Sequence, residues 1–191
     1  MAITIDQDTL MFFHDVLIEF YRNTEDPITL GQINSIVDVC AERPFTDIYD
    51  FIPFPHILHK AAVLMDSIID YHPFIDGNKR VALLATFYFL YWNGYDLIIP
   101  EDAANFTIEI AKRKHSLNNI VSWLIRNSKR NLRTVTRNIL LSRFLSSTMG
   151  RLEPGTLTGA FLTPMFFTPY PFLFFRYLIA KKAKQKASQG T

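Results

Sequence analysis

One nine-residue segment, from His72 to Arg80, gathers side chains whose types and spacing could do chemistry. His72 can act as a general base near neutral pH. Asp76 offers the hard oxygen ligand that suits the Mg²⁺ accompanying a nucleotide. Lys79 and Arg80 add two adjacent cations. Together these residue types indicate a site for a phosphate-bearing ligand.

The segment is a short polar loop between two hydrophobic stretches, and it opens directly into the second one. The first N–H groups of a helix have no partner within the helix and lie at the positive end of its dipole, so they suit phosphate oxygens. Gly77 lets the backbone turn tightly and approach a ligand. Cations at a helix N-terminus are unfavourable unless an anion binds there. The pattern therefore predicts an anion site on Gly77, Asn78, Lys79 and Arg80.

Each of these residues also has a purely structural interpretation. His72 could cap the preceding helix, Asp76 could be an N-cap, and Lys79 and Arg80 could be solvated. For any residue taken singly, the structural interpretation is the stronger one. Their combination within one turn and cap favours a functional site.

Two hydrophobic stretches must position the loop. The first stretch has a wide apolar face and follows Pro55, and proline suits the first turn of a helix. This helix must stop at Tyr71–His72 because the residue before Pro73 is disfavoured in a helix. The second, Asn78–Trp92, has no proline or glycine and is apolar almost all round, which is typical of a central, buried helix. Asn93–Gly94 is a C-cap pair.

The remaining pattern is also helical, and no strand pattern of comparable strength occurs. We predict an all-α fold, a compact helical bundle with a central buried helix after the loop. The other expected elements are a helix capped by Thr9, a helix after Thr29 that ends near Pro44 with Ile33, Ile36 and Val37 inward, an irregular loop over Arg43–Pro55, and helices near Glu101–Arg113 and over Leu117–Arg130, the last capped by Ser116.

Composition excludes a chain that is disordered throughout, since 49% of its 191 residues are hydrophobic and 20% are charged. The single cysteine, Cys40, cannot form an internal disulfide and is expected in the core. Met1 and the residues after it lack the basic and apolar regions of a signal peptide, so we expect a cytoplasmic protein.

Charge divides the chain. Residues 1–130 carry 11 Lys/Arg against 17 Asp/Glu, whereas residues 131–191 carry 9 against 1. We predict a catalytic domain over residues 1–130 and a basic, Phe/Pro-rich C-terminal extension of unknown role over residues 131–191.

Two features of the C-terminal part leave alternatives open. The stretch Pro154–Phe175 has no charge, is interrupted by prolines and precedes a cluster of four lysines. We rank a packing or protein interface first, membrane contact through residues 154–186 second and disorder third. If the last helix continues, Arg126, Lys129, Arg130, Arg133 and Arg137 form a basic stripe. A non-enzymatic binding module is the competing hypothesis, but no nucleic-acid motif accompanies the stripe, so we expect no specific nucleic acid.

The segment His72–Arg80 resembles the signature of the Fic/Doc (Fido) family, H-x-F-x-[DEN]-[AG]-N-[GK]-R, at every defined position. Outside it, His14-Asp15, Lys60-Ala61-Ala62 and Asn93-Gly94-Tyr95 resemble the Doc branch. The resemblance covers about residues 8–130.

The resemblance implies a transferase that moves a phosphate-containing group from ATP to a hydroxyl of a target protein. His72 would be the catalytic base and Asp76 the Mg²⁺ ligand. Phe74 would be buried as an anchor. Gly77, Asn78 and Lys79 would offer the anion-binding helix N-terminus, and Arg80 would grip a phosphate. The Arg43–Pro55 loop would take the place of the substrate-docking flap of relatives.

Two departures separate this chain from AMP-transferring members, which have glycine at the position of Lys79 and arginine at that of Leu83. Both resemble the Doc branch, so phosphorylation is favoured and AMPylation is the alternative. None of the six glutamates follows a Ser or Thr by four residues, as the autoinhibitory motif requires. The resemblance therefore implies a toxin controlled by a separate antitoxin chain, with a protein substrate such as a translation component.

Overall fold

Helices dominate this computed structural model, which describes residues 2–22, 24, 27–49 and 51–131. In that part of the chain the helices are α1 Gln7–Tyr21, α2 Asn34–Glu42, η1 Arg43–Phe45, α3 Ile57–Tyr71, α4 Asn78–Trp92, α5 Ala103–Ala111 and α6 Leu117–Asn127. Two three-residue strands, β1 Tyr95–Leu97 and β2 Ser128–Arg130, complete it. The prediction of an all-α fold is confirmed, with this small sheet added.

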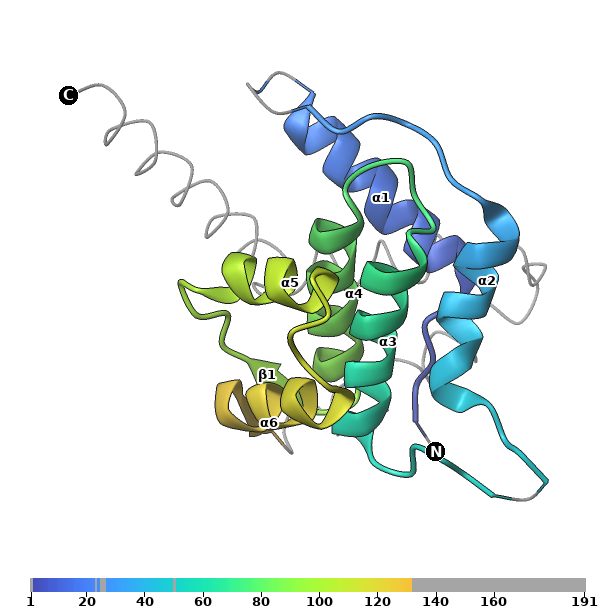
Figure 1. Cartoon of the computed structure of the whole chain (residues 1–191), viewed down its shortest axis with the longest axis vertical. Helices are drawn as coiled ribbons and strands as arrows, with labels where there is room; N and C mark the ends of the chain where they lie inside the picture. The colour runs from blue at the N-terminus through green and yellow to red at the C-terminus, as the bar shows by residue number, and fades with distance from the viewer. Residues whose placement is uncertain (1, 23, 25–26, 50, 132–191) are drawn as a thin grey trace, which may run out of the picture. The chain divides into compact units, whose positions relative to one another are not determined.

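The centre of the described structure is the antiparallel pair α3 and α4, which lie side by side (Figure 1). Both bury nearly their whole circumference, and Ala61, Met65, Val81, Ala85 and Leu90 are fully inaccessible to solvent. The small alanines allow the two helices to approach closely, while the larger side chains fill the remaining space. The predicted central helix over Asn78–Trp92 is confirmed to the residue.

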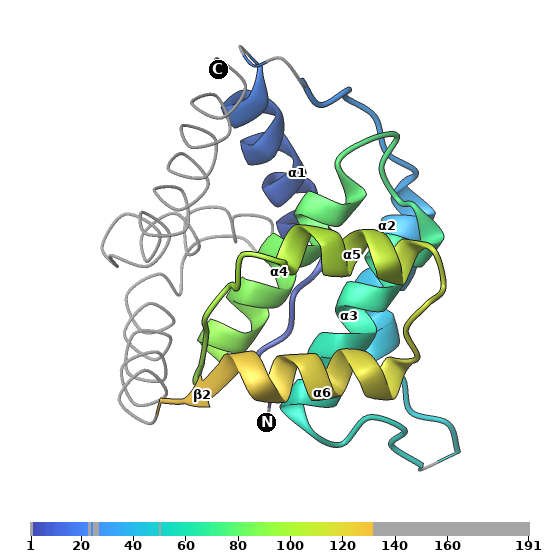
Figure 2. The ribbon, with the colours of Figure 1, turned by 60° about the vertical axis from the view of Figure 1, so that its left-hand side comes forward.

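The other helices cover this pair. Helices α1 and α2 contact each other and pack on α4 and α3 respectively, whereas α5 and α6 lie across the pair from another side (Figures 1 and 2). Phe106 of α5 stacks on Trp123 of α6 with ring centroids 4.6 Å apart. Cys40 of α2 is fully buried, as predicted, and burial raises the pKa of its thiol to about 12.

Several helix ends predicted from the sequence are wrong. Asp6, not Thr9, caps α1, because the Asp6 carboxylate accepts the Thr9 N–H at 2.9 Å. Helix α3 begins at Ile57 after the N-cap His56, so Pro55 lies outside the first turn. Ile33 is 53% exposed and precedes α2 instead of facing inward. By contrast, the predicted cap of α6 is confirmed, since Ser116 Oγ accepts the Asn119 N–H at 3.3 Å.

Helix α6 ends at Asn127, so the prediction that it continues to Arg130 is wrong. Residues 128–130 instead pair with β1 in antiparallel register, Tyr95 opposite Arg130 and Leu97 opposite Ser128. Their backbone groups therefore find partners in the segment that follows α4. Arg126 lies on the helix and Lys129 and Arg130 on the strand, so these three do not form one helical stripe; Arg133 and Arg137 lie outside the described residues.

The predictions for residues 132–191, including Pro154–Phe175 and the lysine cluster, also lie outside the described residues, and the domain boundary at residue 130 stays a prediction. In the part of the chain that the structure describes, no helix combines the length and the apolar character needed to cross a bilayer.

Candidate active site

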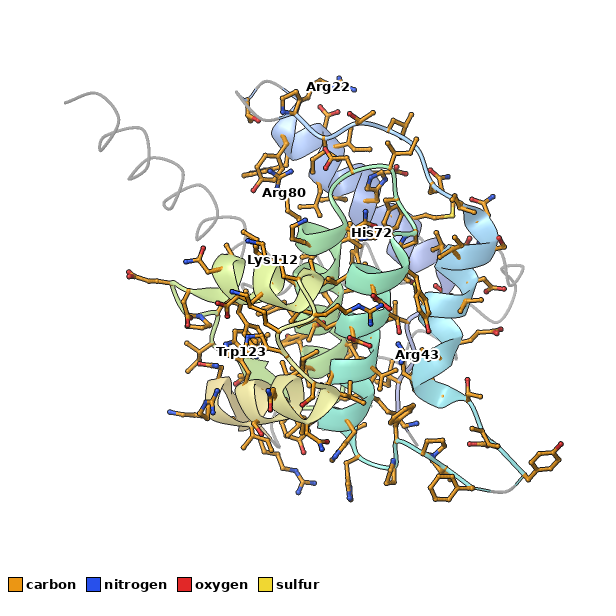
Figure 3. All side chains as sticks on the ribbon, in the orientation of Figure 1. Arg22, Arg43, His72, Arg80, Lys112 and Trp123 are labelled. Atoms are coloured by element: carbon orange, nitrogen blue, oxygen red, sulfur yellow. The ribbon has the colours of Figure 1, made fainter. Side chains whose placement is uncertain are left out.

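The signature loop begins where α3 ends. Helix α3 stops at Tyr71, as predicted from Pro73, and His72 is its C-cap in the left-handed conformation with φ 48° and ψ 57°. The His72 side chain is exposed, whereas Pro73 is buried. A left-handed residue reverses the chain direction after the helix, so His72 projects at the same end of the α3–α4 pair as Arg80 (Figure 3).

The loop is anchored to the core by Phe74, which is 2% exposed, as predicted. Asn78, in the first turn of α4, holds the backbone of Phe74 from both sides. Its Oδ1 accepts the Phe74 N–H at 3.0 Å, and its Nδ2 donates to the Phe74 carbonyl at 2.7 Å. The buried Asn78 side chain thus fixes the loop, a role that the anion-site prediction did not include.

His14 of α1 is the part of the site whose contacts the sequence did not reveal. The residue is 1% exposed, its ring stacks on Phe74 with centroids 4.2 Å apart, and its Nε2 lies 3.1 Å from the Asp76 carbonyl oxygen. Because a carbonyl can only accept, Nε2 must carry the proton. Burial lowers the pKa of His14, opposed by the hydrogen bond to Asp76 and by the charges of Asp15 and Asp76.

Residues 28–33 run alongside the loop. The Ile33 N–H donates to the Pro73 carbonyl at 2.8 Å, and the Ile75 N–H donates to the Gly31 carbonyl at 2.9 Å. This pairing brings the exposed apolar side chains of Leu30 and Ile33 beside the signature, which itself exposes Ile75.

The Arg43–Pro55 loop, by contrast, lies near the other end of α3 (Figure 1). Lys60, near the start of α3, donates to the Pro44 carbonyl at 2.8 Å. A helix of 15 residues is about 22 Å long. Of the described loop residues, Arg43 reaches back along α3, to Asp66 and the Tyr71 ring, and residues 28–33 are the segment that runs alongside the signature. The role of the Arg43–Pro55 loop as a substrate-docking flap stays a prediction.

Asp76 is half-buried at the entrance to α4. Its Oδ1 accepts the Gly77 N–H at 2.6 Å, and its Oδ2 accepts the Thr29 N–H at 3.3 Å. No group of three or more His, Cys, Asp or Glu side chains is arranged to hold a metal ion among the residues described. A metal at Asp76 would thus take most of its ligands from a nucleotide and water, as Mg²⁺ commonly does.

Gly77 is the N-cap of α4, with φ 80° and ψ 1°. A Cβ at this position would lie 3.1 Å from Ile28 Cγ2, so both the conformation and the space favour glycine. No side-chain cap is formed at this end of α4, and the first turn holds no acidic residue. The structure therefore combines an uncapped helix N-terminus with the exposed Lys79 and with Arg80, whose guanidinium lies 4.4 Å from the centroid of the Tyr21 ring.

Comparison of the sequence with known proteins identifies its family. The sequence model of the Fic/DOC family matches residues 4–90, a range that includes the whole signature and His14. The protein "Toxin Doc" of Mycolicibacterium smegmatis is 32% identical over 117 residues, which cover 54% of this chain and 90% of that relative. The chain belongs to the Fic/DOC family, whose members are transferases.

Proposed function

We propose that this chain transfers a phosphate-containing group from ATP to a hydroxyl side chain of a target protein. One observation carries the proposal: the exposed His72 immediately precedes a loop that leads through Asp76 and Gly77 into the uncapped N-terminus of α4. A base and an anion site at one end of one helix pair are the parts that phosphoryl transfer needs, because such catalysis consists mostly of positioning and charge neutralisation.

The residues present fit a nucleotide with its metal ion. Gly77 allows the left-handed turn that leads into the uncapped first turn of α4, so the backbone N–H groups there can bind phosphate oxygens. Asp76 has carboxylate oxygens of the hard type that Mg²⁺ prefers. A bound Mg²⁺ would supply charge neutralisation on the phosphates. Lys79 and Arg80 would add positive charge at the same helix end.

His72 would perform the proton transfer. As the target hydroxyl oxygen forms its bond to phosphorus, its proton would pass to an imidazole nitrogen of His72, and the bond between phosphorus and the leaving phosphate oxygen would break. The exposure of His72 leaves its ring accessible to a target side chain. Residues 28–33 flank the loop, so a target side chain that reaches His72 would lie near them.

Phosphorylation is favoured over AMPylation. Lys79 and Leu83 stand where AMP-transferring relatives have glycine and arginine, and the curated relative bears the name Toxin Doc. Incubating the purified chain and a cell lysate with ATP labelled at either the α- or the γ-phosphate tests this. Protein-bound label from the γ-position only is expected, and label retained from the α-position would establish AMPylation instead.

The proposal extends to a toxin that acts in the cytoplasm on a translation component and is controlled by an antitoxin chain. The relative's name and the absence of the autoinhibitory glutamate motif from the sequence support it. Expression of the chain alone should arrest growth, and co-expression of a small protein encoded beside it should restore growth. Unimpaired growth on expression of soluble, folded chain would contradict the toxin proposal.

A further inference from the structure

A single peptide unit, between Asp76 and Gly77, links His14 to the carboxylate of Asp76. The His14 Nε2–H donates to the carbonyl oxygen of this unit at 3.1 Å. The N–H of the same unit belongs to Gly77 and donates to Asp76 Oδ1 at 2.6 Å. Because a trans peptide is planar and its C=O and N–H point in opposite directions, fixing the carbonyl also fixes the direction of the N–H that holds the carboxylate.

The ring of His14 is itself held in place. It is 1% exposed and lies nearly parallel to Phe74, with an interplanar angle of 18° and centroids 4.2 Å apart. Phe74 in turn is fixed by the two hydrogen bonds from the Asn78 side chain. The His14 N–H donor of α1 therefore has one orientation relative to the loop, although His14 and Asp76 are 62 positions apart in the sequence.

A purely space-filling role would not require an imidazole. A phenylalanine could stack on Phe74 equally well, and it would avoid burying a polar ring. What only the imidazole adds is the N–H aimed at the Asp76 carbonyl.

We propose that His14 is a positioning residue that orients the Asp76 carboxylate toward Mg²⁺ through the Asp76–Gly77 peptide unit. The inference rests on the proposed function, in which Asp76 is the metal ligand. Groups that orient a ligand from behind typically change metal affinity or activity by about 10–100-fold when they are removed.

The test separates the hydrogen bond from the ring. His14→Phe keeps the stack on Phe74 and removes the donor, whereas His14→Gln keeps an N–H donor and removes the ring. ATP affinity is measured by calorimetry for each protein, once with excess Mg²⁺ and once with EDTA. The quantity of interest is the factor by which Mg²⁺ strengthens ATP binding.

Asp76→Asn, measured alongside, gives the factor that remains when the proposed metal ligand is lost. We expect His14→Phe to reduce the factor by about tenfold, or to the Asp76→Asn value where that variant loses less. ATP affinity in EDTA should stay within about twofold of the wild type. His14→Gln should keep most of the factor. Phe106→Leu, which disturbs the buried aromatic stack on Trp123, is the matched control and should keep all of it.

A wild-type factor in His14→Phe would overturn the inference while leaving the proposed function intact. If instead the wild-type chain binds ATP with no dependence on Mg²⁺, the metal role of Asp76 and this inference both fail. Should His14→Phe not fold, nitrogen-15 NMR of the wild-type imidazole decides independently: the proposal requires the proton on Nε2, and a proton on Nδ1 alone would overturn it.

Discussion

Gly77→Ala is the substitution whose effect the structure determines most sharply. Gly77 has φ 80° and begins α4 at the proposed phosphate site. Adding one methyl group changes no charge and removes no hydrogen-bonding group. Any effect must therefore come from backbone strain and from crowding at this point.

Two contributions can be estimated. The left-handed conformation is unfavourable for an L-residue by about 1–2 kcal/mol. The new Cβ would also lie 3.1 Å from Ile28 Cγ2 and 3.7 Å from His14 Cδ2, so the buried Ile28 has to shift by a few tenths of an ångström. Overpacking of this kind typically costs at least about 1 kcal/mol. We expect the free energy of unfolding to fall by about 2–3 kcal/mol.

Gly94→Ala is the matched control. Gly94 has φ 83° and lies just beyond the other end of α4, so the same substitution introduces the same type of strain away from the signature. Urea unfolding measures stability, and calorimetry measures ATP affinity in Mg²⁺. Gly77→Ala should weaken ATP binding at least about tenfold, by analogy with the loss of other oriented phosphate contacts, whereas Gly94→Ala should not change it. Equal ATP affinity in the two variants would refute the placement of the phosphate site.

Three further outcomes follow from local contacts. Asn78→Ala leaves the buried N–H and carbonyl of Phe74 without their partners, so urea unfolding should show a loss of about 2–4 kcal/mol; a loss below 1 kcal/mol would contradict this role. Burial raises the pKa of Cys40 from 9.0 to about 12, so the folded thiol is neutral at pH 8 and should react with Ellman's reagent only on unfolding. The contribution of this thiol to the free energy of unfolding is present below pH 9.0 and should decline as the pH rises from 9.0 toward about 12. Rapid labelling of the folded chain would argue against burial. Asp6→Ala should lower stability by about 1 kcal/mol through loss of the α1 cap, whereas Asp6→Asn should retain most of it; an equal loss in both would show that the cap is not the cause.

The helices next to the signature were predictable because local rules determine them. Pro73 ends α3 at Tyr71, and an unbroken apolar stretch defines α4 from Asn78 to Trp92. The capping of α6 by Ser116 follows an equally local pattern. Each of these features depends on residues within a few positions of one another.

Features that depend on distant pairing were not predictable. The end of α6 at Asn127 is set by a strand that pairs Ser128 with Leu97, and nothing in the residues Ser-Lys-Arg signals a strand. The contact between His14 and Asp76 spans 62 positions. Ile33 matched a helical pattern, but its N–H donates to the Pro73 carbonyl, and this pairing holds it outside α2.

The central claim is that this chain transfers a phosphate-containing group through His72. Mass spectrometry of host proteins after expression of the wild-type chain or of His72→Ala, at equal amounts of folded protein, tests it most directly. The account predicts an added mass of one phosphate on a serine, threonine or tyrosine with the wild-type chain and no such addition with His72→Ala. An undiminished modification by His72→Ala, or no modification by either chain, would contradict it.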